Sequence, residues 1–149
     1  MKALLEPIKE IARFDELFRD LKKGTAGVTV ISGCLESQKA HMIAGLSEDV
    51  PVRLLIAENE LKAKELYEDY RLYDAETLYY PAKDLIFYQA DIHGNLLIRQ
   101  RLQVIQALLE RKEVTIITSV GGCMDFLLPL GVFEKHCIHL RNDSELDLD

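Results

Sequence analysis

A chain of 149 residues with 48% hydrophobic and 29% charged residues is long and apolar enough for one globular domain, which excludes a disordered protein. A net charge of −7 argues against a broad nucleic-acid-binding surface, because such surfaces are usually basic. No apolar run approaches the ~20 residues of a membrane span, and three widely spaced cysteines form neither a disulfide framework nor a zinc spacing. We therefore expect a cytoplasmic protein with no membrane partner and no metal.

The first part of the chain predicts two helices, a strand and a third helix. Residues 3–12 read as a short amphipathic helix or ordered arm, and apolar residues at helical spacing from Phe14 predict a second helix that Gly24 ends. The β-branched run at 28–32 predicts a buried strand, and 40–46 predicts a helix after an intervening loop.

The remaining chain alternates strands and helices. The predicted elements are a strand at 52–57, a helix at 60–72, a strand at 77–80, a loop at 81–92, a helix at 94–111, a strand at 114–118, a short helix at 123–127 and a candidate last strand at 136–140. The long helix has a predicted core stripe of Ile98, Leu102, Ile105 and Leu109. Near-continuous apolar strands between helices predict an α/β fold: a three-layer parallel sheet with helices on both faces.

Three regions follow from this order. Residues 1–24 are expected to be a helical arm and helix packed on the domain, and 25–134 to be the α/β subdomain itself. The acidic stretch at 135–149 reads as the start of a linker or a next subdomain that is truncated here.

The segment 33–40 resembles a phosphate-binding loop (P-loop) that has lost part of its pattern. Gly33 and Lys39 stand at the P-loop spacing, between a predicted strand and a predicted helix. Gln38 replaces the second glycine, where a left-handed backbone would strain it by ~1–2 kcal/mol. Ala40 lacks the hydroxyl that holds Mg²⁺, and Glu36 would repel a phosphate. We predict a RecA/P-loop-like domain with a degenerate P-loop and no bound cofactor, in which Lys39 is a solvated residue at the start of a helix.

The connection at 81–92 contains the strongest apolar run outside a regular element. This run is Leu85, Ile86, Phe87 and Tyr88. A loop this apolar normally packs on something, so the four residues are a candidate interface with a neighbouring domain.

Several blocks of the sequence carry a resemblance to a known family. Residues 55–59 followed by Leu66 and Tyr67 resemble the second helicase block of the excision-repair protein UvrB. Residues 107–114 followed by 118–120 resemble a later part of it, and Arg101-Leu102 stands where that family's long helix carries Arg-Leu.

Two departures point away from UvrB itself: the incomplete P-loop, and a short connection at 81–92 in place of a long aromatic hairpin. Both are features of the N-terminal UvrB-like region of the bacterial transcription-repair coupling factors (Mfd). Over most of residues 27–133 the chain resembles the first subdomain of that region.

The resemblance implies a non-catalytic scaffold segment of a longer protein. In this family the full-length protein is an ATP-dependent DNA translocase that releases stalled RNA polymerase and recruits the excision-repair protein UvrA. The resemblance places ATP and Mg²⁺ in a downstream motor, UvrA on the adjoining subdomain, and RNA polymerase and DNA on distant domains. It implies contacts with other domains of the same chain, no catalytic residue here, and no strong nucleic-acid binding by this segment.

Two alternatives stay open at this point. The first alternative to the scaffold segment is an active helicase-type ATPase half-domain with an unusual loop, and the second is an unrelated α/β adaptor module. The sequence contains no Asp-Glu-x-His or Asp-Glu-x-Asp block of the Walker B type, which disfavours the ATPase.

Overall fold

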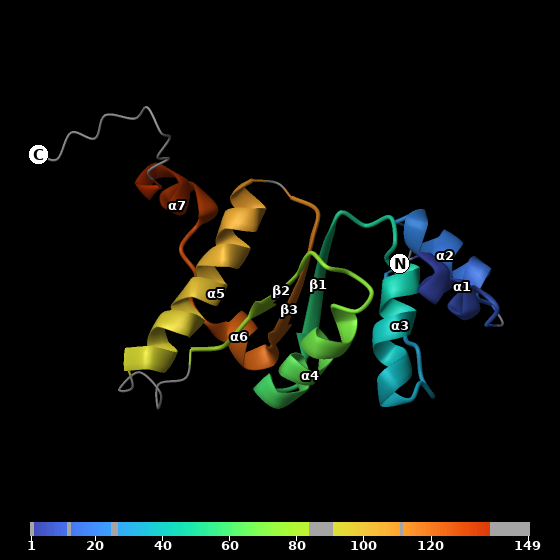
Figure 1. Ribbon diagram of the computed structural model, residues 1–149. Helices are drawn as coiled ribbons and strands as arrows, with labels where there is room; N and C mark the ends of the chain where they lie inside the picture. The colour runs from blue at the N-terminus through green and yellow to red at the C-terminus, as the bar shows by residue number, and fades with distance from the viewer. Residues whose placement is uncertain (1, 12, 25–26, 84–90, 111, 138–149) are drawn as a thin grey trace, which may run out of the picture.

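A three-stranded parallel sheet lies among the helices of the chain (Figure 1). The computed structural model describes residues 2–11, 13–24, 27–83, 91–110 and 112–137. The strands are β1 (Val52–Ala57), β2 (Thr77–Tyr80) and β3 (Val114–Ser119). β3 is central and pairs in parallel with both others, which gives the order β1-β3-β2. The α/β class and the parallel sheet are confirmed, and the predicted bounds of β1 and β2 agree with the structure.

Seven helices accompany the sheet in the described parts of the chain. They are α1 (Lys2–Lys9), α2 (Phe14–Lys22), α3 (Glu36–Leu46), α4 (Glu60–Tyr70), α5 (Asp91–Leu109), α6 (Val120–Met124) and α7 (Leu130–His136). None of these helices is long and apolar enough to cross a membrane. The division of the chain at residues 24 and 134 stays a prediction.

Two apolar clusters lie against opposite sides of β3, because successive strand residues point to opposite faces. On one side, Ile117 packs with Tyr70 of α4 and with Ala40 and Ala44 of α3, and Leu5 of α1 joins this cluster. The other cluster brings α5 against the sheet; its buried members are Tyr80, Val104, Ala107, Val114 and Ile116. The helices α1 and α2 contact α3, so the N-terminal helices pack on the rest of the molecule through it.

The strand predicted at 28–32 is wrong. This segment is not part of the sheet, and Val28 and Val30 are 92% and 83% exposed. Residues 29–34 instead run beside α2 and α3, where they line a hollow with Phe14 and Met42. A β-branched sequence favours a strand only where a neighbouring strand can pair with it, and no described strand pairs with this one.

Two other expectations need correction. In the long helix Ile105 is buried, but Ile98 and Leu102 are 47% and 49% exposed, while Arg101 is buried in their place. The helix therefore presents a face to the sheet that differs from the stripe we predicted. The candidate last strand is also wrong where it is described, because His136 ends helix α7.

One face of β1 has little cover among the described residues. Val52, Leu54 and Ile56 pair in register with Val114, Ile116 and Thr118, so they share the sheet face that α5 covers. The main contacts of α5 with the sheet are with β2 and β3, and the three side chains of β1 are about half exposed. This edge of the sheet therefore leaves an apolar face open.

Gly122 supplies the first prediction. A Cβ at this position would lie 2.2 Å from Thr118 Oγ1 and 3.3 Å from the Tyr80 carbonyl oxygen. We expect Gly122→Ala to lower the free energy of unfolding by about 1–3 kcal/mol, because the strand ends must separate to admit the methyl group.

Gly121→Ala is the matched control, since a Cβ there meets only ordinary contacts at 3.5 and 3.6 Å. Urea melts of both variants measure the difference. Equal stabilities for the two variants would contradict the close packing of α6 on β3.

Candidate functional site

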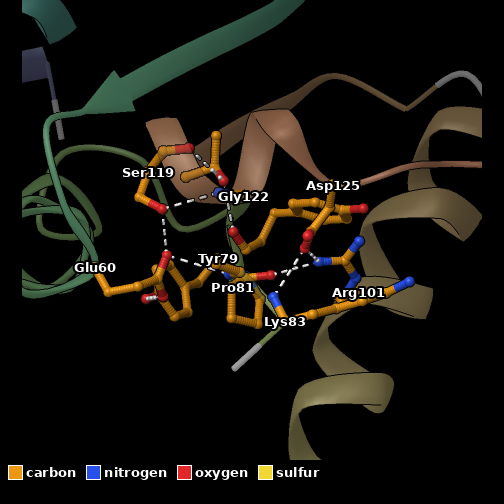
Figure 2. A network of polar contacts seen from close by, with 11 residues as sticks. Glu60, Tyr79, Pro81, Lys83, Arg101, Ser119, Gly122 and Asp125 are labelled. Atoms are coloured by element: carbon orange, nitrogen blue, oxygen red, sulfur yellow. Dashed lines mark hydrogen bonds and ion pairs between the residues drawn. The ribbon is translucent and has the colours of Figure 1, made fainter. Parts of the chain in front are cut away.

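The carboxyl ends of the strands meet beside the first turns of α4 and α6 (Figure 2). In open α/β sheets, ligands bind outside this end of the strands, so it is the first place to examine for a site. Here a network of hydrogen bonds and an ion pair occupies it. The network has two centres, Glu60 and Arg101, joined by the main chain at 81–83.

Glu60 is the first residue of α4, and its carboxylate accepts three hydrogen bonds. The Tyr79 hydroxyl donates to Oε2 at 2.5 Å, whereas the Ser119 hydroxyl and the Ala82 N–H donate to Oε1 at 2.5 and 3.1 Å. The Ser119 oxygen in turn accepts the Gly122 N–H at 3.0 Å, which caps α6. One carboxylate therefore connects β2, β3 and the starts of two helices.

The local electrostatics favour this arrangement. The Asn59 side chain caps α4 by accepting the Lys62 N–H at 2.9 Å, so the ordered helix N-terminus stabilises the negative charge of Glu60. Burial, and then the hydrogen bond to Glu60, raise the pKa of Tyr79 well above its ordinary value. The phenol therefore stays protonated at neutral pH and remains a donor.

Arg101 is the second centre, on α5. Its guanidinium donates to the Pro81 carbonyl oxygen at 2.8 Å and to Asp125 Oδ2 at 2.7 Å. The Lys83 N–H donates to the same Oδ2 at 2.8 Å, and the guanidinium carbon lies 4.2 Å from the centre of the Tyr80 ring. Arg101 is only 7% exposed, so its charge is buried but paired.

The network closes the strand ends with the protein's own side chains. A ligand entering here would have to break several of these bonds. Ser119 and Glu60 touch as a nucleophile and a base would, but Ser119 is 1% exposed and its hydroxyl caps a helix. In the described part of the chain, no cluster of His, Cys, Asp and Glu could hold a metal ion. We call this network, which is centred on Glu60 and Arg101, the clamp, because it holds the strand ends to α4, α5 and α6.

The P-loop-like segment has a different geometry from the one its pattern suggests. Gly33 keeps a left-handed backbone (φ +83°), but α3 already begins at Glu36. Gln38 lies within this right-handed helix, so the expected strain does not arise, and its Oε1 accepts the Leu35 N–H at 3.1 Å. Ala40 is 1% exposed, in the core against α4 and α1.

An acidic hollow of about 340 Å³ lies between α3, α4 and the end of β1, where Lys39 is found. Its charged lining consists of four carboxylates and two ammonium groups: Glu36, Glu58, Glu65, Asp69, Lys39 and Lys62. Both ammonium groups are paired, Lys39 with Glu36 at 2.7 Å and Lys62 with Glu65 at 2.8 Å. An anion in this hollow would meet an excess of negative charge.

The pairing also fixes the charge of these groups. The hydrogen bond from Lys39 lowers the pKa of Glu36, and the hydrogen bond to Glu65 raises the pKa of Lys62. The Glu36 carboxylate and the Lys62 ammonium are therefore charged at neutral pH. Lys39 is half exposed at the start of α3, as a solvated helix residue would be.

The interface predicted at Leu85, Ile86, Phe87 and Tyr88 falls outside the residues that the structure describes. The clamp residues were not predicted as a set, although Arg101 was noted in the family resemblance. One signal was local: Asn59 followed by Glu60, shortly after a predicted strand, marks a helix start. Nothing in the sequence separates Arg101 from Arg99 of the same helix as the arginine with a buried partner.

The chain is similar to transcription-repair-coupling factors, which are much longer than the chain itself. The transcription-repair-coupling factor of Staphylococcus aureus (strain USA300) is 30% identical over 154 aligned positions, which cover 100% of this chain and 13% of the relative. The same protein from strain MRSA252 gives the same figures, and that of Staphylococcus haemolyticus is 28% identical over 123 positions, covering 80% of this chain and 10% of the relative. No family model matches the chain.

The resemblance to the transcription-repair coupling factor is therefore confirmed. It extends over the whole chain, beyond the range of 27–133 that carried it in the sequence. The chain spans 13% of the length of the S. aureus coupling factors. Its assignment to the first subdomain of the coupling factor's N-terminal region stays a prediction.

Glu60 supplies the second prediction. We expect Glu60→Ala to cost about 1–3 kcal/mol of unfolding free energy, because it leaves the Ala82 N–H and two hydroxyls without their acceptor. Glu60→Gln should cost less, since the amide oxygen still accepts and its NH₂ donates to the Tyr79 oxygen.

Glu58→Ala is the control, because Glu58 is exposed two residues earlier and its carboxylate accepts a hydrogen bond from Asn59, outside the clamp. Thermal and urea melts give the three values. If Glu60→Ala costs no more than the control, the carboxylate does not hold the strand ends together.

Proposed function

We propose that this chain is a non-catalytic, UvrB-like scaffold segment of a transcription-repair coupling factor. One observation carries the proposal: the similarity to coupling factors covers all of this chain but 13% of their length. A segment of this size would serve the longer protein by packing and by presenting surface. The RecA-like, three-layer arrangement of the complete domain is part of the same proposal.

The geometry at the two places where a nucleotide would bind supports a non-catalytic role. The strand ends are filled by the Glu60 and Arg101 clamp, and the hollow beside Lys39 carries more negative than positive charge. A triphosphate would be repelled by that hollow. The alternative of an active ATPase half-domain would require both places to rearrange.

The open face of β1 supports a scaffold role. Val52, Leu54 and Ile56 form an apolar row on an edge strand, and exposed edges of this kind are usually covered. In our proposal, other domains of the coupling factor supply the cover. UvrA is contacted through the adjoining subdomain, and RNA polymerase and DNA through distant domains that also hold the ATP-dependent translocase. The net charge of −7 supports weak nucleic-acid binding by this segment.

The third prediction is that the chain does not bind Mg-ATP. Calorimetric titration should give no saturable heat in the micromolar range, because the acidic hollow disfavours a polyanion and Ala40 offers no hydroxyl to Mg²⁺. Nucleotide binding is the property that separates the scaffold from the ATPase alternative.

The contradicting result is micromolar binding that Lys39→Ala abolishes and Lys62→Ala leaves intact. Lys62 is the matched control because it lines the same hollow and forms the same kind of ion pair one helix away. Such a result would show that the P-loop-like segment is a working nucleotide site.

A further inference from the structure

A groove of about 430 Å³ lies between α5, the segment 126–128 and α7. Its walls are almost entirely apolar, and the main side chains are Leu97, Ile98, Leu102, Ile105, Leu128 and Phe133. Lys83 and Arg101 are the charged residues on its lining. Ile98 and Leu102 are the residues that we expected in the core, so the part of the predicted core stripe that leaves the sheet forms this groove.

Apolar surface is exposed along the groove and beyond it. In the groove Phe126 is 78% exposed and Leu128 is 46% exposed, and Met124, two residues before Phe126, is 81% exposed. Isolated exposed apolar residues are normal in proteins, but a row of large ones beside an apolar groove marks a contact surface.

The groove is poorly suited to a small polar ligand. Ligand sites place a few convergent polar groups on apolar walls. Here the Arg101 guanidinium is already bound to Asp125 and to the Pro81 carbonyl, which leaves the Lys83 ammonium as the one charged group at the groove free of an ion pair within the described residues. The walls fit apolar side chains from a peptide segment that carries negative charge nearby.

We propose that the segment following α7, residues 138–149, docks its leucines in this groove. These residues lie outside the described part of the chain, and α7 leads directly into them. Phe133 of α7 forms part of the groove wall and lies four residues before Cys137, the last described residue. The tether gives the segment an effective concentration in the millimolar range, so a weak contact suffices.

The sequence of this segment matches the groove. It ends Glu-Leu-Asp-Leu-Asp, so Leu146 and Leu148 alternate with carboxylates. In an extended chain the two leucines point to one side and the carboxylates to the other. The leucines then fill apolar walls while the carboxylates remain in water, within reach of Lys83.

The segment is also long enough. Leu146 lies nine positions after Cys137, a stretch that spans up to ~30 Å when extended. The α5 side of the groove, from Leu97 to Ile105, is ~12 Å long. The leucines can therefore reach any part of the groove. This inference concerns contacts within the chain and does not depend on the proposed function.

The test places a photo-reactive benzoylphenylalanine at Leu148 of the full chain and, as a control, at Asn142. After irradiation, peptide mapping by mass spectrometry locates the cross-links. We expect the Leu148 probe to attach within the same chain to peptides containing 97–105 and 126–133, and the Asn142 probe to attach there far less. Mixing isotopically heavy and light protein separates contacts within one chain from contacts between copies.

A second measurement uses 8-anilinonaphthalene-1-sulfonate, a dye that fluoresces on exposed apolar surface. The double variant Leu146→Asp/Leu148→Asp should raise its fluorescence several-fold, whereas Asn142→Asp/Ser144→Asp, which adds the same charge to the same segment, should not. Cross-links found only between copies, or absent from both groove peptides, would overturn the proposal. So would equal dye fluorescence in the two variants.

Discussion

The carboxylate of Glu60 is the interaction on which the arrangement of the strand ends depends. Its three donors come from β2, from β3 and from the loop after β2, while the residue itself begins α4. The loop then passes to the Arg101–Asp125 pair, which brings in α5. Parallel strands are connected by long crossovers and not by tight turns, so no hairpin ties their ends together. In this protein the joining groups lie where other α/β proteins leave room for a ligand.

Much of the fold was predictable from local sequence. The strands at 52–57 and 77–80 are apolar runs bounded by proline, and their limits agree with the structure. The predictions failed where contacts with other segments of the chain decide the local structure. Residues 28–32 have strand composition but no neighbouring strand, and the rotation of α5 follows from the buried ion pair of Arg101, which an apolar count treats as a surface residue. Apolar residues at helical spacing predict a helix, but they do not fix which of its faces is buried when a charged residue has a buried partner.

The sequence drew attention to one part of the candidate site. The P-loop pattern singled out Lys39, whose hollow is lined by Glu36 and three further carboxylates. The sequence did not show that α3 begins at Glu36, that Gln38 bonds to the Leu35 N–H, or that Ala40 lies in the core. The clamp joins residues as far apart as Glu60 and Ser119, and such pairs become visible only when the strand order is known. The chain is similar to coupling factors over its whole length, and under the proposal made above the open face of β1 is where their other domains would pack.

The closure of the strand ends is most directly tested by amide hydrogen exchange at Ala82, Lys83 and Gly122. Their N–H groups bond to Glu60, Asp125 and Ser119 side chains, outside the hydrogen bonding of the sheet. If the clamp is the constraint described here, these three amides exchange as slowly as those of β3, and Glu60→Ala speeds the exchange of Ala82 most. Fast exchange of all three in the unaltered protein, beside a protected β3, would show that the strand ends are open and would contradict the account.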